Sequence, residues 1–265
     1  MKLAITGKGG VGKTTLSAAL AILFSREGSR VVAIDADPDS NLAATLGFPH
    51  PEDIKPLSQM KDLIVERTGA QDGAFGGFFK LNPKVDDIPD AYAAEHSGIK
   101  LLVMGGQGRS GGSGCLCPEN AFLRALMAHL LFASEDVVIM DMEAGIEHLT
   151  RGTARGVDAL IVVVEPGERS LDTARRIGRL SADLGIGRIW AVANKVRGEQ
   201  DREFILHGLP ELELAASLPY SPEVIECGTG RAGLAQVLDG PVGREVQNLL
   251  GRLHQEAGRI GPLRG

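Results

Sequence analysis

Cysteine is scarce in this chain, with three residues in 265. So few thiols, and an odd number of them, do not make a disulfide framework. We therefore expect a protein of the reducing cytoplasm, in which a cysteine is kept for chemistry or packing.

Long apolar runs and excess positive charge are also missing. No run reaches the roughly 18–20 apolar residues that a membrane span needs. The N-terminal MKLAIT leads directly into a glycine-rich loop, so we expect no secretory signal peptide. The net charge of −6 and the pI near 5.6 argue against a nucleic-acid-binding surface, although a local basic patch would be compatible with them. We expect neither nucleic acid nor membrane as a partner.

Short β-branched runs alternate with helical patterns along most of the chain. The predicted strands are residues 2–6, 30–35, 99–104, 135–141, 158–165, 188–194 and 212–218. The predicted helices include 13–27, 118–133, 170–184 and 235–257. Strands that are apolar throughout, such as ALIVVVE, are typical of a sheet covered on both faces. We expect an α/β fold with a doubly wound, mostly parallel sheet of about seven strands and helices on both faces, forming a single domain over 1–265.

Residues 50–98 interrupt this alternation. They contain one expected helix, 58–67, and then a passage rich in glycine and proline without a clear period. One interpretation is a surface excursion. The other is a mobile element near the site, because long loops in compact domains are often functional.

Glycine is abundant, at 35 residues, and residues 7–14 read GKGGVGKT. This is the pattern G-x-x-x-x-G-K-[ST] between a predicted strand and a predicted helix, the context of a phosphate-binding P-loop. Its backbone N–H groups and the positive end of the helix are suited to a nucleotide phosphate. Lys13 is expected to reach the β- and γ-phosphates of ATP and the Thr14 hydroxyl to bind Mg²⁺. The expected nucleotide-binding residues of the loop are Gly9, Gly10, Val11, Gly12, Lys13, Thr14 and Thr15.

A second lysine, Lys8, lies inside the loop. Alone it would be read as a solvated charge. With the Gly-Gly-Val-Gly-Lys-Thr-Thr that follows, however, the loop resembles the deviant Walker A motif of the MinD/ParA/nitrogenase-iron-protein class. The resemblance implies that Lys8 reaches across a homodimer to the nucleotide of the partner, so Lys8 is counted with Lys13 among the catalytic residues.

Acidic residues follow two of the predicted strands. VVIMDMEAG places Asp141 where a Walker B carboxylate would hold Mg²⁺, directly or through water. VVAIDADPDSN places Asp35, Asp37 and Asp39 after the second strand, and resemblance to the class gives Asp37 the catalytic position that orients the attacking water. The alternative for all of them is a strand-end carboxylate that caps a nearby loop, and Asp35 and Asp39 fit either interpretation.

The sixth predicted strand ends in Asn194-Lys195. In the same class an asparagine at this place reads the nucleobase, usually adenine, so both residues are predicted to contact nucleotide. A polar strand end without that role is the alternative.

Two of the cysteines stand one residue apart in GGSGCLCPEN. Cys115 and Cys117 are too close to form a comfortable disulfide. In an extended segment they would point to one side and offer two thiolates to one ion. Pro118 suits the first position of a helix, whose positive end would stabilise a thiolate at Cys117. A closed thiolate site usually has four ligands, and a twofold-related copy of the chain would supply the other two.

A C-x-C pair is a weak motif by itself, and a chance or redox pair is the alternative. Cys227 is expected to be a buried or incidental thiol. His129 and His148 are possible metal ligands but are expected to be ordinary polar helix residues. The basic stretch that contains Arg175, Arg176 and Arg179 is expected to be a solvated helix face.

With these motifs in place, the chain resembles the CooC family of ATPases, accessory proteins for nickel insertion into carbon monoxide dehydrogenase. The stretches that carry the resemblance are GKGGVGKTT, IDADPDSNLAATLG, CLCPENAFLRALM, DMEAGIEHLTRGT and VANKV. The resemblance implies ATP or ADP with Mg²⁺, a homodimer, nickel or zinc at Cys115 and Cys117, and apo carbon monoxide dehydrogenase as the client.

The sequence therefore predicts an ATP-driven metallochaperone. Two alternatives stay open. The cysteines could hold an iron–sulfur cluster, as in an electron carrier like the nitrogenase iron protein. The chain could also be a positioning ATPase of the MinD/ParA type that acts on DNA or membranes.

Overall fold

The computed structural model describes residues 1–70, 78–105, 117–146, 149–228 and 233–259. Its centre is an eight-stranded sheet in the order β3-β4-β2-β5-β1-β6-β7-β8. All neighbouring strands are parallel except β3 and β4. The strands are β1 (Lys2–Gly7), β2 (Val31–Ala36), β3 (Ala94–His96), β4 (Ile99–Val103), β5 (Val137–Met142), β6 (Ala159–Val164), β7 (Ile189–Val196) and β8 (Glu213–Pro219).

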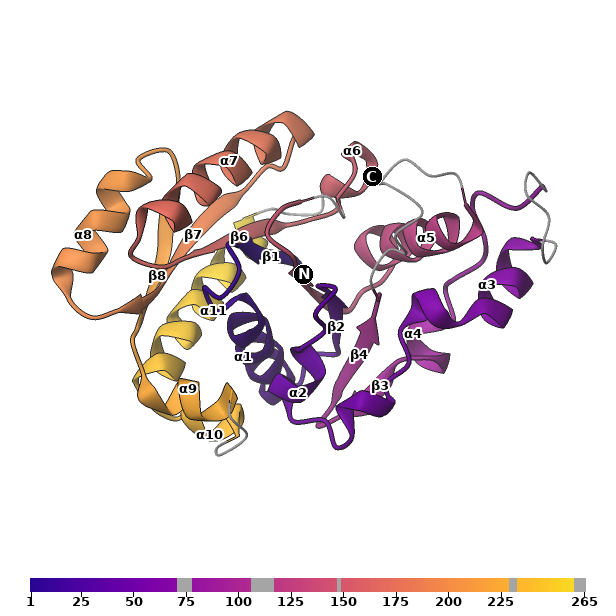
Figure 1. Cartoon of the computed structure of the whole chain (residues 1–265), viewed down its shortest axis with the longest axis horizontal. Coiled ribbons are helices and arrows are strands. Elements are labelled where there is room, and N and C mark those ends of the chain that lie inside the picture. Colours follow the sequence, from indigo (N-terminus) through magenta and orange to yellow (C-terminus); the bar gives the residue numbers. More distant parts are fainter. Residues whose placement is uncertain (71–77, 106–116, 147–148, 229–232, 260–265) are drawn as a thin grey trace.

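Helices cover both faces of the sheet (Figure 1). They are α1 (Lys13–Arg26), α2 (Leu42–Leu46), α3 (Lys61–Thr68), α4 (Ile88–Ala91), α5 (Pro118–Phe132), α6 (Arg151–Ala154), α7 (Glu168–Leu184), α8 (Glu199–Gly208), α9 (Pro222–Gly228), α10 (Leu234–Val237) and α11 (Pro241–Arg259), with short 3-10 turns at Pro51–Asp53 and Leu57–Gln59. No helix in the described ranges is long and apolar enough to cross a membrane.

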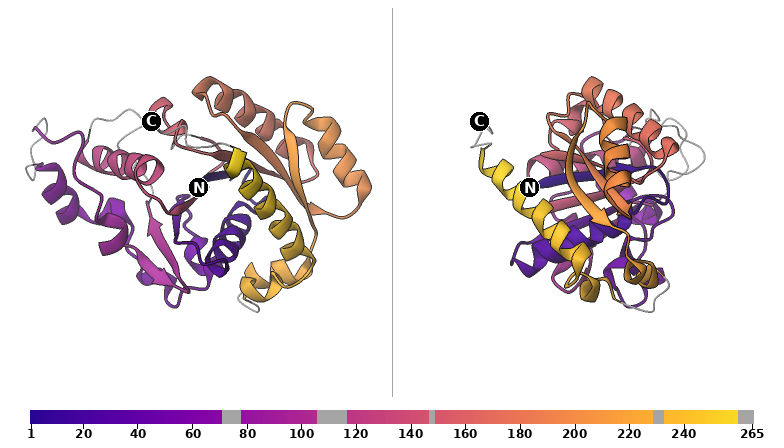
Figure 2. Two further views of the ribbon diagram at one scale, coloured as in Figure 1. Left: turned by 180° about the vertical axis from the view of Figure 1, so that it is seen from behind. Right: turned by 90° about the vertical axis from the view of Figure 1, so that its left-hand side faces the viewer.

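Two apolar cores lie on opposite sides of the sheet. One joins the sheet to α3, α5, α7 and α8, and the other joins it to α1, α2, α10 and α11. Helix α11 packs on β8 and α1, as the view from behind shows (Figure 2). Side chains of β1 such as Leu3 and Ala4 alternate between the two cores, and both are fully buried. The apolar character of this strand is explained by burial on both faces.

The α/β class and the doubly wound sheet are confirmed, but the strand count of about seven was too low. The missed strand is β3, a three-residue edge strand with the sequence AEH that pairs antiparallel to β4. It is too short and too polar to give a periodic signal. The expected helix 235–257 is interrupted between Val237 and Pro241, because proline cannot donate the N–H that an uninterrupted helix needs.

Residues 50–98 are not only a surface excursion. Leu57, Leu63, Ile64, Val85 and Ile88 are all buried in the core under α5. The segment therefore covers one end of the sheet, with α4 near β4 and α3 packed against α5 (Figure 1). Its apolar residues come from turns and short helices, so they lack the regular spacing by which a longer element is recognised.

Candidate functional site

The glycine loop lies between the central strand β1 and α1, at the carboxyl ends of the parallel strands. Gly12 precedes the first residue of α1 with φ +99°, in the region that favours glycine. A Cβ on Gly12 would lie 2.3 Å from Nδ2 of Asn194. At the other end of the loop, a Cβ on Gly7 would lie 2.3 Å from the carbonyl oxygen of Val163. The loop is therefore fitted closely against the neighbouring strand ends β6 and β7.

Lys13 begins α1, and its side chain is almost fully buried. Its Nζ lies 3.9 Å from Oδ2 of Asp37, which follows β2. Thr14 and Thr15 occupy the same first turn and are half-buried. The structure thus brings together four of the predicted residues, a cation, a carboxylate and two hydroxyls, around one helix start, where the positive end of the helix favours phosphate.

Asp35 and Asp141 are opposite each other in the register of β2 and β5, and both are fully buried. Burial raises the pKa of Asp35 to about 7, although the backbone N–H groups of Leu42 and Asp37 hydrogen-bond to the carboxylate and lower the pKa. These bonds, 3.0 Å from Leu42 N to Oδ2 and 3.2 Å from Asp37 N to Oδ1, tie the loop after β2 to the end of that strand. Asp35 therefore fits the loop-capping alternative. Asp37 itself accepts a hydrogen bond from the backbone N–H of Asp39 at 3.1 Å.

Burial also raises the pKa of Asp141, to about 6, and hydrogen bonding from the hydroxyls of Thr14 and Ser17 offsets part of the rise. Ser17 donates to Oδ1 over 3.0 Å. The second oxygen, Oδ2, is buried and accepts no well-aligned hydrogen bond from a described residue. A buried, unsatisfied carboxylate oxygen is costly by itself and is a good ligand for a hard cation. The residues at this point therefore fit Mg²⁺, directly or through water.

Thr6 is a site residue that the sequence did not reveal. Its buried hydroxyl is 2.9 Å from the carbonyl oxygen of Glu143 and 2.7 Å from that of Gly145, and it accepts from Gly145 N at 3.2 Å. This one hydroxyl fastens the chain just after Asp141 to the strand that leads into the P-loop. A threonine within a β-strand is so common that no local pattern would have singled it out.

Asn194 and Lys195 meet the P-loop from the end of β7. Nδ2 of Asn194 donates to the carbonyl oxygen of Val11 at 2.8 Å, and Oδ1 accepts from the N–H of Lys195 at 2.9 Å. Lys195 has φ +58°, at an irregularity in the pairing of β7 with β8, and its Nζ donates to the carbonyl oxygen of Gly10 at 2.7 Å. Both ends of the Asn194 amide are engaged with the protein, so the pair braces the loop.

Glu165 is a second residue that the sequence did not reveal. It follows β6, and Oε2 lies 2.7 Å from Nζ of Lys195, while Oε1 lies 3.9 Å from Nζ of Lys8. Lys8, the expected dimer-crossing lysine, is therefore held close to a carboxylate of its own chain.

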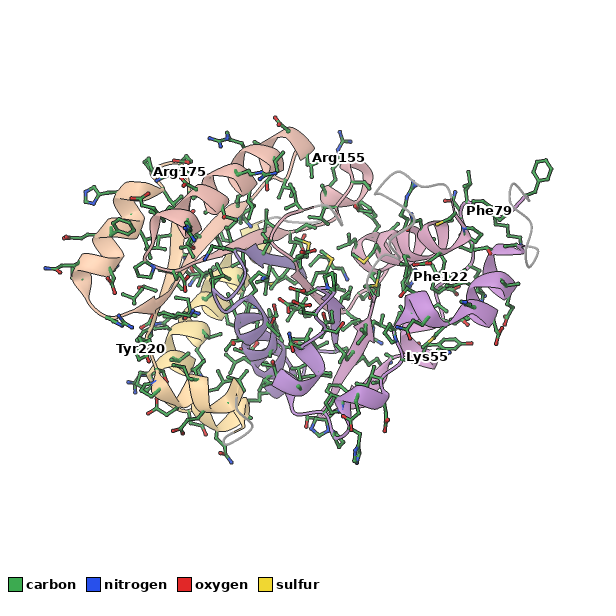
Figure 3. The ribbon with its side chains drawn as sticks, viewed as in Figure 1. Lys55, Phe79, Phe122, Arg155, Arg175 and Tyr220 are labelled. Atoms are coloured by element: carbon green, nitrogen blue, oxygen red, sulfur yellow. The ribbon has the colours of Figure 1, made fainter. Side chains whose placement is uncertain are left out.

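A cavity of about 200 Å³ continues from the P-loop between α1 and the ends of β7 and β8. Apolar side chains from α1, α9, α10 and α11 form most of its wall, and the polar lining includes Thr15, Asn194 and Tyr220. Tyr220 lies in the turn between β8 and α9 (Figure 3), and the guanidinium of Arg197 lies 5.0 Å from the centroid of its ring. An apolar slot next to a phosphate loop suits a nucleoside. The turn sequence LPYSPEV, directly after a strand, was the available signal for this wall.

Cys117 is half-buried and free, and it occupies the N-cap position of α5 with an extended backbone (φ −122°, ψ 156°) and no capping hydrogen bond from its side chain. The start at Pro118 is as predicted. Cys115 and His148 lie outside the described residues, and within those residues no three His, Cys, Asp or Glu side chains converge on a possible metal position. His129 is about three turns further along α5, where it lines a polar hollow with Lys100 and Asp136 away from Cys117.

The third cysteine is separate from this region. Cys227 is a half-buried thiol in α9, and burial raises its pKa. Three arginines were expected on a solvated face of α7. One of them, Arg175 (Figure 3), instead contacts other parts of the protein: it donates to the carbonyl oxygen of Gly208 and pairs with Asp172.

Comparison with known proteins gives the context of this site. Residues 2–230 match the family described as CobQ/CobB/MinD/ParA nucleotide binding domain. The chain is 46% identical over its whole length to carbon monoxide dehydrogenase accessory protein CooC of Rhodospirillum rubrum, covering 99% of that protein. It is 44% identical, over 94% of its length and 96% of the relative's, to an uncharacterized ATP-binding protein of Methanocaldococcus jannaschii.

The fold comparison agrees with these relationships. The MinC:MinD cell division protein complex of Aquifex aeolicus contains a chain that superposes with a TM-score of 0.68 at 18% identity, covering 96% of this chain and 95% of that one. At this identity the likeness concerns the fold alone. The family match and the full-length relative extend it to the chemistry: the chain belongs to the CooC family of ATPases, within the CobQ/CobB/MinD/ParA nucleotide-binding group.

Proposed function

We propose that this ATPase is a metallochaperone that carries nickel to apo carbon monoxide dehydrogenase. The proposal rests on one observation above the others: a free, half-buried thiol, Cys117, stands at the start of α5, two residues after Cys115. The positive end of a helix stabilises a thiolate, the form of cysteine that binds metal. The full-length relative that is named as a carbon monoxide dehydrogenase accessory protein supports the choice of client.

Two thiolates from one chain leave a soft or borderline ion incompletely coordinated. We propose that a second copy supplies the other two, so that Cys115 and Cys117 of both protomers hold one ion at a twofold axis. The transported ion is the cargo, nickel in the proposal, and the same thiolates would accept zinc. The dimer is also what the lysine at position 8 implies by resemblance, through a contact with the nucleotide of the partner.

In the ATPase site, the P-loop residues Gly9–Thr15 would bind the phosphates of ATP or ADP, and the cavity beside Tyr220 would take the nucleoside. Lys13 and Lys8 would neutralise charge that develops on the transferred phosphoryl group. Asp37 would orient the attacking water. Asp141 and Thr14 would hold Mg²⁺, which supplies further charge neutralisation when bound.

One helix, α5, separates the cysteine pair from the strand that carries Asp141. Asp141 is the last residue but one of β5, and the hydroxyl of Thr6 bonds the chain that follows it, next to the P-loop. The cysteines precede α5, which leads into β5. We propose that a change at the nucleotide moves the segment after Asp141 and, with it, the cysteine segment, so that hydrolysis and metal release are linked.

The test is metal analysis of the purified protein with a double variant, Cys115→Ala/Cys117→Ala, and a matched control, Cys227→Ala. The control removes the remaining thiol, which is far along the chain in α9. We expect the control to keep the metal of the wild type and the double variant to lose it. Equal metal content in all three proteins would contradict the site. Stoichiometric iron and sulfide after anaerobic purification would instead favour the electron-carrier alternative.

The client is tested separately. Cells that lack this protein should produce carbon monoxide dehydrogenase with low activity, and excess nickel in the medium should restore that activity. Activity that is normal without the protein would contradict a role in nickel delivery.

A further inference from the structure

The carboxylate of Glu165 lies between two lysines that belong to different parts of the site. Oε2 pairs with Nζ of Lys195 at 2.7 Å, and Oε1 faces Nζ of Lys8 at 3.9 Å. Lys195 comes from the end of β7, while Lys8 lies in the P-loop. One carboxylate thus lies close to two lysines, Lys8 and Lys195, that are 187 positions apart in the sequence.

Glu165 is fixed from two directions. Its backbone N–H donates to the hydroxyl of the buried Ser170, in the first turn of α7, at 3.1 Å. The lysine that holds its Oε2 is fixed as well, since Lys195 has a left-handed backbone and donates to the carbonyl oxygen of Gly10 at 2.7 Å. A non-glycine residue held at positive φ needs support from its surroundings. The second oxygen, Oε1, is consequently held beside the P-loop.

The other P-loop lysine has a similar arrangement. Lys13 faces Asp37 at 3.9 Å, as Lys8 faces Glu165 at 3.9 Å. Each cation that is expected to meet phosphate charge is thus next to a carboxylate of its own chain. The two differ in exposure: the Lys13 side chain is 7% exposed and that of Lys8 is 38% exposed. Lys8 is the one whose surroundings allow it to turn outward toward another molecule.

We propose that Glu165 is a positioning residue that holds Lys8 against its own subunit, so that association of two subunits requires Lys8 to exchange this carboxylate for the phosphates of the partner's nucleotide. The proposal rests on the proposed function, because it assumes that Lys8 crosses the dimer. The consequence is that association of the subunits depends on the nucleotide: the fewer phosphate charges the partner's nucleotide carries, the less favourable it is for Lys8 to leave Glu165.

The contact between Lys8 and Glu165 is weak, so it makes association less favourable without preventing it. Both side chains are partly exposed, and exposed ion pairs separated by about 4 Å contribute little free energy and are screened by salt. A symmetric dimer breaks two such contacts. We therefore expect their removal to tighten the dimer by about threefold to tenfold at low ionic strength, and by less at high salt.

The experiment compares Glu165→Gln with the wild type and with a control, Glu168→Gln. The control makes the same charge change three residues along, at an exposed position in the first turn of α7. The glutamine at 165 retains a carbonyl oxygen that accepts from Lys195, which favours an intact P-loop. Sedimentation with a saturating non-hydrolysable ATP analogue and Mg²⁺ measures the dissociation constant of the dimer. We expect tightening in Glu165→Gln alone, and less of it at high salt.

A second measurement concerns the nucleotide-free protein and does not depend on association. The rate at which an acylating reagent modifies Lys8, followed by mass spectrometry, should rise in Glu165→Gln and stay at the wild-type value in Glu168→Gln. An unchanged rate at Lys8 in Glu165→Gln would overturn the proposal even if the dimer tightened. An unchanged dimer in the variant, when the wild type does associate, would also overturn it. A wild type that never associates with nucleotide would contradict the dimer of the proposed function, and Lys8 labelling would still decide whether Glu165 holds Lys8.

Discussion

Ser17 donates a hydrogen bond of 3.0 Å to Oδ1 of Asp141, which leaves Oδ2 of the same carboxylate buried without a well-aligned donor among the described residues. Ser17 lies in α1, one helical turn after Lys13, the residue at which the helix begins. One oxygen is thus committed to the protein, and the other is available to a cation.

This arrangement predicts a pH dependence of stability. Burial raises the pKa of Asp141 to about 6 and that of Asp35 to about 7, so between pH 4 and 7 the folded state binds more protons than the unfolded chain. The free energy of unfolding should therefore fall as pH rises through this window in nucleotide-free protein. Asp141→Asn should remove the contribution of Asp141 to this change in the free energy of unfolding, on the order of 2–3 kcal/mol at most over the whole window. Thermal unfolding across pH 4–8 measures it.

The same variant should respond less to ligand. Mg²⁺ favours the ionised carboxylate, so the stabilisation that Mg²⁺ adds in the presence of ATP should grow with pH in the wild type and be largely lost in Asp141→Asn. A variant with the wild-type pH slope and the wild-type response to Mg²⁺ would show that Asp141 has neither the raised pKa nor the ligand role.

Gly12→Ala should be far more damaging than Gly9→Ala. An alanine at 12 needs φ +99° and would place its Cβ 2.3 Å from Nδ2 of Asn194, whereas a Cβ at Gly9 meets nothing within 4 Å. Left-handed backbone and the displaced Asn194 together should cost about 1–3 kcal/mol of stability. Urea unfolding of the two variants measures the difference. Equal stability of both would mean that the loop can move away from β7 at no cost.

Asn194→Ala distinguishes bracing of the loop from reading of the base. Because both ends of its amide are hydrogen-bonded to Val11 and Lys195, the geometry predicts that ATP and GTP lose affinity by the same factor, about 5- to 10-fold for a lost hydrogen bond of ordinary strength. Nucleotide titrations followed by calorimetry give both constants. A loss confined to ATP would instead support direct contact with adenine.

Thr6→Val should uncouple the segment after Asp141 from the P-loop. Valine has the shape of threonine but cannot bond the carbonyl oxygens of Glu143 and Gly145, and we expect a cost of about 1–3 kcal/mol for buried groups left unpaired. ATP hydrolysis should fall while ATP affinity changes little. Thr6→Ser is the control, since it keeps the hydroxyl. Equal hydrolysis by the serine and valine variants would exclude a role for the hydroxyl.

The sequence was informative where a pattern is local. The P-loop glycines, the buried strand runs and the start of α5 at Pro118 are each visible within a dozen residues, and the structure has them as predicted. Strand β3 was missed because three residues at a sheet edge, two of them polar, are too few to show a period. The break before Pro241 was visible as a proline, yet the apolar spacing on both sides of it suggested one continuous helix.

Contacts between distant residues were out of reach. The hydroxyl of Thr6 meets a carbonyl 139 positions away, and Glu165 meets Lys195 across 30 positions. Neither residue type is unusual where it stands, so only the packing of β1, β6 and β7 into neighbouring strands shows what they do. Asn194 was expected to contact the nucleotide, and only the fold shows that its Nδ2 donates to the P-loop at Val11 while its Oδ1 accepts from the N–H of Lys195.

The most direct test of the account is to measure bound metal and solution mass on the same sample, with and without a non-hydrolysable ATP analogue. The account predicts one nickel or zinc ion per two chains in a species of twice the chain mass. It also predicts neither that metal nor that species in Cys115→Ala/Cys117→Ala. A chain that binds one ion tightly while it stays a monomer under every nucleotide condition would contradict the account.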